Sequence, residues 1–350
     1  MLAPVTNVLP LTRILRNRRT PVKGSVLVRK GQTVHANDIV AEANLYPRHL
    51  LLNVSRALGV SSNVAEENIV LRQGQQIVKG DIIAGPIGLT RRVMRSPQDG
   101  RVILTGNGQV LLDVSSSMVQ IKAGIPGKVV DLIPEYGAVI ETTGALVQAV
   151  WGNGKIDYGL MRSILKSPNH EVTPDQLDVT MRGAVVLAGC CKNVEVLNST
   201  MELPLRGLIL SSLTPGLVKI AQHIQVPIIV LEGFGFRPFN HRTYNLLVSS
   251  DQREVAINAE PAQRTTGTKP ELVIPLPSTE SIEYPTEAGI FKPGQFVRII
   301  CAPHAGKAGE IIGMKGQASF PSGLQLPAAE VHLEEGKQIL IPLANLEVIA

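Results

Sequence analysis

The sequence contains an internal repeat that restricts the fold of its first third. One copy is VLVRKGQTVHANDIVA, which begins at Val26, and the other is IVLRQGQQIVKGDIIA, which begins 43 residues later at Ile69. Each copy places Gly, Asn-Asp or Gly-Asp turn residues between short runs of alternating apolar residues, a pattern typical of strand, turn and strand. A repeat of this kind favours several small β-units. It predicts two half-barrels in this part of the chain.

The length and composition indicate a folded chain of several domains. At 350 residues the chain is longer than a domain with a single hydrophobic core usually is. Its 44% of hydrophobic and 18% of charged residues are typical of a folded rather than a disordered chain. Aromatic residues make up only 3%. Abundant Val, Ile, Leu, Gly and Pro suit short strands joined by tight turns. The net charge of +5 permits an acidic partner without requiring one.

The segment at residues 96 to 114 continues the strand-and-turn pattern of the repeat. SPQDGRVILTGNGQVLLDV, residues 96 to 114, adds a turn and two strands, with Asn107-Gly108 as a hairpin turn. Together with the repeat, this segment resembles the biotinyl/lipoyl barrel-sandwich family over roughly residues 20 to 125. Carrier members of that family present a lysine at a hairpin tip, but residues 80 to 121 contain none. The resemblance therefore implies a structural or docking unit, and we expect no cofactor.

The stretch between the two copies, residues 43 to 66, departs from the strand pattern. Leu50, Leu51, Val54 and Leu58 would share one face of a helix. We therefore predict a short helix that bridges the two half-barrels.

The middle of the chain predicts a small parallel α/β domain. Its continuous apolar runs, at residues 182–189, 205–213 and 226–235, are typical of strands buried on both faces. A helix with Thr214 as its N-cap alternates with them. Ligands of such sheets bind beyond the carboxyl ends of the strands. The candidate ligand-binding residues there are Cys190, Ser211, Ser212, Thr214, Glu232, Gly233 and His241. The alternative is that these residues only cap helices and form turns.

The end of the chain resembles another known motif. KPGQFVRIICAPHAGKAGEII, residues 292 to 312, resembles the KOW motif of ribosomal proteins and NusG-type transcription factors, with Gly306 and Gly309 at the tight loop. The resemblance implies an SH3-like β-barrel that contacts RNA or protein. The candidate nucleic-acid-binding residues are Arg298, His304, Lys307 and Lys315. The acidic residues Glu310, Glu330, Glu334 and Glu335 oppose them, so the charge gives phosphate binding little advantage.

The sequence offers no catalytic constellation or metal site. Its three cysteines, Cys190, Cys191 and Cys301, have neither disulfide nor zinc spacing. No nucleophile elbow or phosphate-binding loop occurs. We expect no signal peptide and no membrane insertion, and therefore a cytoplasmic protein.

These observations predict an α+β multidomain fold and leave three functions open. The predicted parts are a β-rich barrel-sandwich region at residues 1–166, a small parallel α/β domain at 171–262 and a KOW-type SH3-like barrel at 286–350. The first hypothesis is a non-catalytic scaffold or adaptor that binds protein partners or self-associates. The second is an RNA-, ribosome- or transcription-associated protein. The third is an enzyme or small-ligand sensor that uses the α/β crevice.

Overall fold

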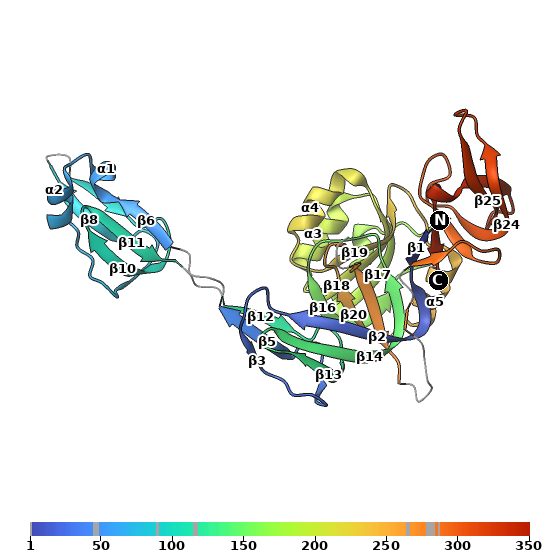
Figure 1. Cartoon of the computed structure of the whole chain (residues 1–350), viewed down its shortest axis with the longest axis horizontal. Coiled ribbons are helices and arrows are strands. Elements are labelled where there is room, and N and C mark those ends of the chain that lie inside the picture. Colours follow the sequence, from blue (N-terminus) through green and yellow to red (C-terminus); the bar gives the residue numbers. More distant parts are fainter. Residues whose placement is uncertain are drawn as a thin grey trace.

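The fold consists mainly of β-strands arranged in several sheets. The computed structural model of the chain describes residues 2–44, 49–88, 91–114, 118–263, 267–277, 284–285 and 288–350. About half of the described residues are in strands and 14% are in helices. Figure 1 shows one part of the molecule, at the left, standing apart from the rest, while both chain ends lie at the right.

A mixed sheet of eleven strands, here called the large sheet, forms the centre of the molecule. Ten strands follow one another in the order β15 (Trp151–Gly152), β19 (Ile228–Phe234), β18 (Gly207–Leu213), β17 (Ala184–Cys191), β16 (Ile156–Ser163), β20 (Glu254–Asn258), β21 (Glu271–Pro275), β14 (Gly137–Gln148), β13 (Gly127–Ile133) and β4 (Thr33–Val34). The eleventh, β2 (Val8–Arg19), pairs with β14. Strands β16 to β19 are parallel, whereas the other pairings of this sheet are antiparallel.

Strands β17, β18 and β19 are buried on both faces, as their uninterrupted apolar runs indicate. The helices of this region are α3 (Val194–Glu202), α4 (Val218–His223) and α5 (His241–Ser249). Val186 of β17 shares one apolar cluster with Leu197 of α3. Its neighbour Val185 points to the opposite face and shares another cluster with Leu247 of α5. This alternation along one strand places α3 and α5 on opposite faces of the large sheet.

Residues 288–350 form a C-terminal module that also includes the first strand of the chain. Its seven-stranded sheet has the order β22 (Ala288–Ile290), β1 (Leu2–Thr6), β27 (Leu346–Ile349), β23 (Phe296–Ile299), β24 (Ala308–Ser319), β25 (Gln325–Leu333) and β26 (Gln338–Pro342). Phe296, Ala308 and Ile349 belong to the apolar cluster that also contains α5 residues. The C-terminal module therefore packs on the α5 face of the large sheet.

Residues 49–114 form an outer module with its own core. Its elements are β6 (His49–Asn53), α1 (Val54–Leu58), α2 (Ser62–Glu67), β7 (Gln76–Ile77), β8 (Ile82–Ile87), β9 (Arg92–Arg95), β10 (Gly100–Gly106) and β11 (Gln109–Asp113). The buried apolar cluster of this module draws only on its own residues. The paired strands β6 and β11 lie next in sequence to the paired strands β5 (Ile39–Asn44) and β12 (Met118–Lys122) of the inner part. The outer module is thus a separate body that stands apart from the large sheet (Figure 1).

The remaining elements are short. A three-stranded sheet consists of β12, β5 and β3 (Ser25–Val26). The 3₁₀ turns are η1 (Pro174–Gln176), η2 (Val179–Met181), η3 (Pro215–Leu217) and η4 (Leu343–Asn345).

The two copies of the repeat fold into the same turn, in different bodies of the molecule. Gly31 and Gly74 have φ values of 88° and 84°, in the left-handed region that favours glycine. Their N–H groups donate to the carbonyl oxygens of Val129 and Val102, each over 2.7 Å. The backbone carbonyl of the glutamine after each glycine accepts a hydrogen bond from the backbone N–H of that same valine. Each turn thereby holds a buried residue of the neighbouring strand by two hydrogen bonds.

The C-terminal module contains a third copy of this turn. Gly294 has a φ of 83°, and its N–H donates to the Ile311 carbonyl over 2.7 Å. The Gln295 side chain accepts from the N–H of Lys292 over 2.8 Å, as Gln75 accepts from Arg72 over 3.0 Å. The shared pattern is a basic residue, any residue, Gly and Gln. One short motif therefore joins neighbouring strands in three places.

The predicted α+β multidomain class is wrong. The parallel strands β16 to β19 are not a separate small α/β domain, because antiparallel strands from residues 8–19, 127–148 and 254–275 continue the same sheet. Among the described residues no sheet closes into a barrel, and the sheet of the C-terminal module ends at β22 and β26. The predicted helix at residues 43–66 begins only at Val54, because His49–Asn53 instead form β6, which pairs with β11.

No helix within the described ranges is both long and apolar enough to span a lipid bilayer.

The repeated turn leads to a first prediction. Substituting Gly74 with alanine should destabilise the outer module by about 1 kcal/mol or more, because an L-residue is strained at this φ. Hydrogen–deuterium exchange of the peptide that contains β10 should increase, since Val102 would be held less firmly. Gly316→Ala is the control, because Gly316 has open space around it and no positive φ. Equal exchange in wild type and Gly74→Ala would contradict this role of the turn.

Candidate functional site

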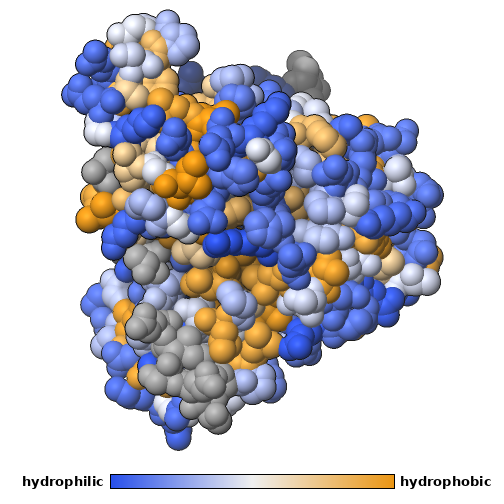
Figure 2. Space-filling model, turned by 90° about the vertical axis from the view of Figure 1, so that its right-hand side faces the viewer, coloured by the Kyte–Doolittle hydropathy of each residue, from blue (hydrophilic) through white to orange (hydrophobic). Residues whose placement is uncertain are grey.

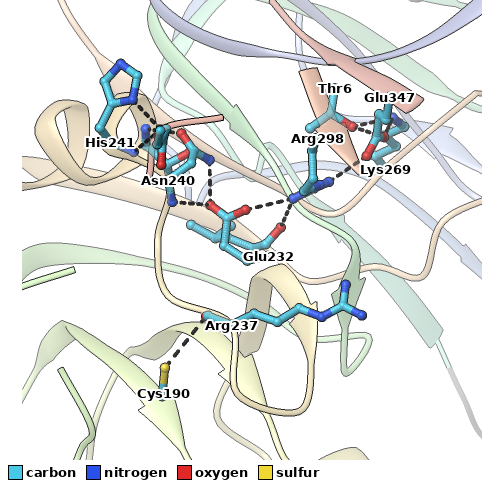
Figure 3. Close-up of polar contacts among 12 residues, drawn as sticks. Thr6, Cys190, Glu232, Arg237, Asn240, His241, Lys269, Arg298 and Glu347 are labelled. Carbon is cyan, nitrogen blue, oxygen red and sulfur yellow. Dashed lines mark hydrogen bonds and ion pairs between the residues drawn. The ribbon is translucent and has the colours of Figure 1, made fainter. Parts of the chain in front are cut away.

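A buried arginine joins the C-terminal module to the large sheet. Arg298 of β23 is only 3% exposed. One of its nitrogens, Nη1, donates to the Glu232 carboxylate over 2.9 Å and to the Leu231 carbonyl over 3.0 Å. The other, Nη2, donates to the Glu347 carboxylate over 2.6 Å. Figure 3 shows the guanidinium between the carboxylates of Glu232 and Glu347. Glu232 belongs to β19 and Glu347 to β27.

Both ends of the chain take part in this network. Glu347 accepts a hydrogen bond from the Thr6 hydroxyl of β1. The Lys269 ammonium donates to the Val5 carbonyl and to Thr6 Oγ1, each over 2.8 Å, and lies 3.5 Å from Glu347. Burial alone would raise the pKa of Glu347, but Arg298, Thr6 and Lys269 together hold it below its usual value. The first strand is therefore fixed to the last by charged groups as well as by backbone pairing.

Glu232 also organises the start of α5. The side-chain nitrogen of Asn240 donates to Glu232 Oε1 over 2.7 Å, and the Asn240 backbone N–H donates to it over 3.3 Å. Asn240 in turn caps α5 by accepting from the Thr243 N–H over 3.0 Å. Burial raises the pKa of Glu232, and Arg298 and Asn240 oppose that rise. Because every partner of the carboxylate is a donor, the geometry is that of an ionised glutamate.

The predicted ligand residues at the strand ends are brought together around the backbone of Arg237. Ser212 Oγ accepts from the Arg237 N–H over 3.1 Å. The Cys190 thiol lies 3.6 Å from the Arg237 carbonyl and 3.1 Å from Ser211 Oγ. These three side chains are buried. They therefore hold the loop that precedes α5 rather than line an open crevice.

The Arg237 side chain passes between two glycines from different parts of the molecule. A Cβ added at Gly233, at the end of β19, would lie 2.9 Å from Arg237 Nη1. A Cβ added at Gly306, in the turn before β24, would lie 3.0 Å from Arg237 Cδ. Any side chain at either position would displace the arginine. Arg237 is a site residue that the sequence reasoning did not select, although it directly follows the predicted Glu232 and Gly233.

A cavity of about 480 Å³ lies between the loop before α5 and the C-terminal module. Its lining comprises Pro168, Asn169, the residues 236–241, the residues 305–308 and the residues 333–335. His241, at the start of α5, lies in this wall and pairs with Glu334. Lys307 pairs with Glu335 over 2.6 Å. Lys307 and His241 of the cavity wall thus each have a carboxylate partner.

The other predicted residues lie elsewhere. Thr214 precedes the 3₁₀ turn η3 and is half-buried, outside the cavity lining. His304 is near the cavity, in the turn that leads to Lys307. Lys315 lies on β24 and pairs with Glu330 over 3.4 Å. Of the four predicted nucleic-acid-binding residues, Arg298 is buried in the network, and the two lysines each pair with a glutamate.

The vicinal cysteines are not arranged as reactive thiols. Burial raises the pKa of Cys191 to about 12. A thiol of this pKa is almost entirely protonated at neutral pH and therefore a poor nucleophile. Within the part of the chain that the structure describes, no group of three or more His, Cys, Asp or Glu residues could hold a metal ion.

Comparison of the chain with known proteins does not place it in a family. The chain matches no protein-family model, and no significantly similar curated protein was found.

The network leads to a second prediction. Arg298→Met should lower the free energy of unfolding by about 3–5 kcal/mol, because Glu232 and Glu347 would stay buried without their cation. Urea unfolding followed by the fluorescence of Trp151, the single tryptophan, measures this, since β15 pairs with the strand that carries Glu232. Lys315→Met is the control, because its ion pair is exposed. An Arg298→Met midpoint equal to that of wild type would show that the network does not stabilise the fold.

Proposed function

We propose that the protein is a non-catalytic cytoplasmic scaffold that binds protein partners through apolar surfaces on its two ends. The observation that carries the proposal is a row of leucines on the uncovered face of the outer module. This module has its own core and stands apart from the large sheet (Figure 1). Such an arrangement suits a protein that holds a partner away from its main body.

The leucine row crosses three neighbouring strands. Leu51 of β6 pairs with Leu111 of β11, and Leu111 pairs with Leu104 of β10. Directly opposite residues of paired strands point to the same side of a sheet. Leu51 is 59% exposed and Leu104 is 57% exposed. The opposite side of these strands faces the module's core, so the row is not needed to fold the module.

The chemistry of the row favours a protein partner. A contiguous apolar surface on a folded module marks an interaction site more often than a scattered one does. Nucleic acid would instead require an excess of basic side chains to neutralise phosphates. We therefore assign the row to an apolar surface of another protein chain.

A second apolar surface lies at the opposite end of the molecule. Leu2 of β1 and Ile290 of β22 pair directly and are 75% and 62% exposed. Figure 2 looks at the side that carries both chain ends, and apolar residues gather across its middle. β22 is an edge strand of its sheet, and edge strands are open to association. Apolar surfaces on two bodies support a bridging role.

The polar side chains predicted at the strand ends serve the fold rather than a reaction. Glu232 is bound to Arg298 and Asn240, and His241 is bound to Glu334. Ser212 and Cys190 contact backbone atoms. These contacts use the side chains for structure, since each has a partner within the fold.

The scaffold proposal predicts position-specific cross-linking. A photoreactive amino acid at position 104 of the full chain, expressed in its native cells, should cross-link to one discrete protein, identified by mass spectrometry. The same residue at position 324 is the control, because Leu324 is equally exposed at 57% but lies outside the row. Adding Leu51→Lys should abolish the product from position 104. Equal products from both positions, or none from position 104, would contradict the proposal.

A further inference from the structure

We propose that the cavity beside α5 binds a small organic molecule with one carboxylate and an apolar body, and that the Arg237 guanidinium holds the carboxylate. This site is distinct from the apolar surfaces of the scaffold. It lies next to the strand-end crevice but uses a residue from outside the predicted set.

Among the described residues, the Arg237 guanidinium has no hydrogen-bond acceptor and no carboxylate partner. Its backbone is fixed by Ser212 and Cys190. Among the described residues, no hydrogen bond or ion pair involves its side chain, and Figure 3 shows the guanidinium pointing away from the Glu232 network. The side chain is half-buried. A partly buried guanidinium favours an anion that replaces its lost water contacts.

Two glycines make room for the Arg237 side chain. Gly233 and Gly306 lie so close to it that a Cβ on either would meet its side chain at about 3 Å. The two glycines therefore leave the space that the Arg237 side chain occupies beside the cavity.

The charges around the cavity favour a single negative charge on the ligand. Lys307 is paired with Glu335, and His241 with Glu334. Among the described residues of the lining, Arg237 is a cation whose side chain has no carboxylate partner. A phosphate monoester carries up to two negative charges near neutral pH and would also approach Glu334 and Glu335. A carboxylate matches the planar guanidinium fork with one charge.

The walls of the cavity supply the apolar part of the site. Phe236, Pro238 and Leu333 line it together with Phe239 and Ala308. A volume of about 480 Å³ falls within the usual range for small-molecule sites. The ligand is therefore a carboxylate with an aromatic or aliphatic body rather than a small inorganic anion.

Isothermal titration calorimetry of the full chain with four probes tests the inference. The probes are 3-phenylpropionate, its neutral amide 3-phenylpropanamide, phenyl phosphate and inorganic phosphate. We expect 3-phenylpropionate to bind, and the amide and both phosphates to bind about tenfold or more weakly. Arg237→Gln should weaken binding of 3-phenylpropionate by about tenfold or more, because it removes the charged donors.

Two further variants separate the proposed site from general effects on folding. Arg237→Lys keeps the charge but loses the fork, so it should weaken binding while Trp151 fluorescence stays native. Arg182→Gln, an exposed arginine outside the cavity, should bind as wild type does. Absence of 3-phenylpropionate binding, equal binding of the amide, tighter binding of phenyl phosphate, or unchanged affinity in Arg237→Gln would each overturn the proposal. None of these results bears on cross-linking at Leu104, which tests the scaffold function separately.

Discussion

The ion pairs of Arg298 determine how the parts of this protein meet. A buried arginine cannot lose its proton, so it requires carboxylate partners within the fold. Glu232 supplies one from the large sheet, and Glu347 supplies the other from the last strand. Because a buried charge without its partner is costly, the C-terminal module is favoured where Arg298 of β23 meets Glu232 of β19. We infer that the network specifies this placement more than it adds net stability.

The placement set by Arg298 creates the features around Arg237. Glu232 holds Asn240, which caps α5 and fixes the end of the loop that contains Arg237. The C-terminal module brings Gly306 against the same side chain. The cavity exists only where these two parts meet, so its shape depends on the buried ion pairs. A structural network and a binding site are thus coupled through neighbouring residues of one loop.

The sequence predicted local structure better than it predicted long-range pairing. The apolar runs around Val185, Leu208 and Ile229 do form buried strands, and the repeat does form equivalent turns at Gly31 and Gly74. These features depend on residue type and local spacing. The mixed large sheet and the pairing of the first strand with the last depend on contacts between distant segments, which no local pattern encodes. The α+β class was wrong for this reason.

The candidate site shows the same limit at the level of single residues. Arg298 has a sequence context typical of a surface strand, but its burial depends on Glu232, 66 positions away. Arg237 could have been noticed in the motif GFGFRP, yet its confinement by Gly306 is visible only in three dimensions. Cys190 and Ser212 were selected from the correct strand ends, and their contacts are with the backbone of Arg237.

The distance between the C-terminal module and the large-sheet region tests the central claim most directly. Cys301 is exposed on the C-terminal module, whereas Cys190 and Cys191 are buried, so one spin label can be attached to the native chain. A second label at Val179→Cys, an exposed position beside the large sheet, completes the pair for pulsed electron paramagnetic resonance. The account predicts one narrow distance distribution in this chain and a broader or shifted one after Arg298→Met. The same narrow distribution in both would contradict the claim that Arg298 fixes the module.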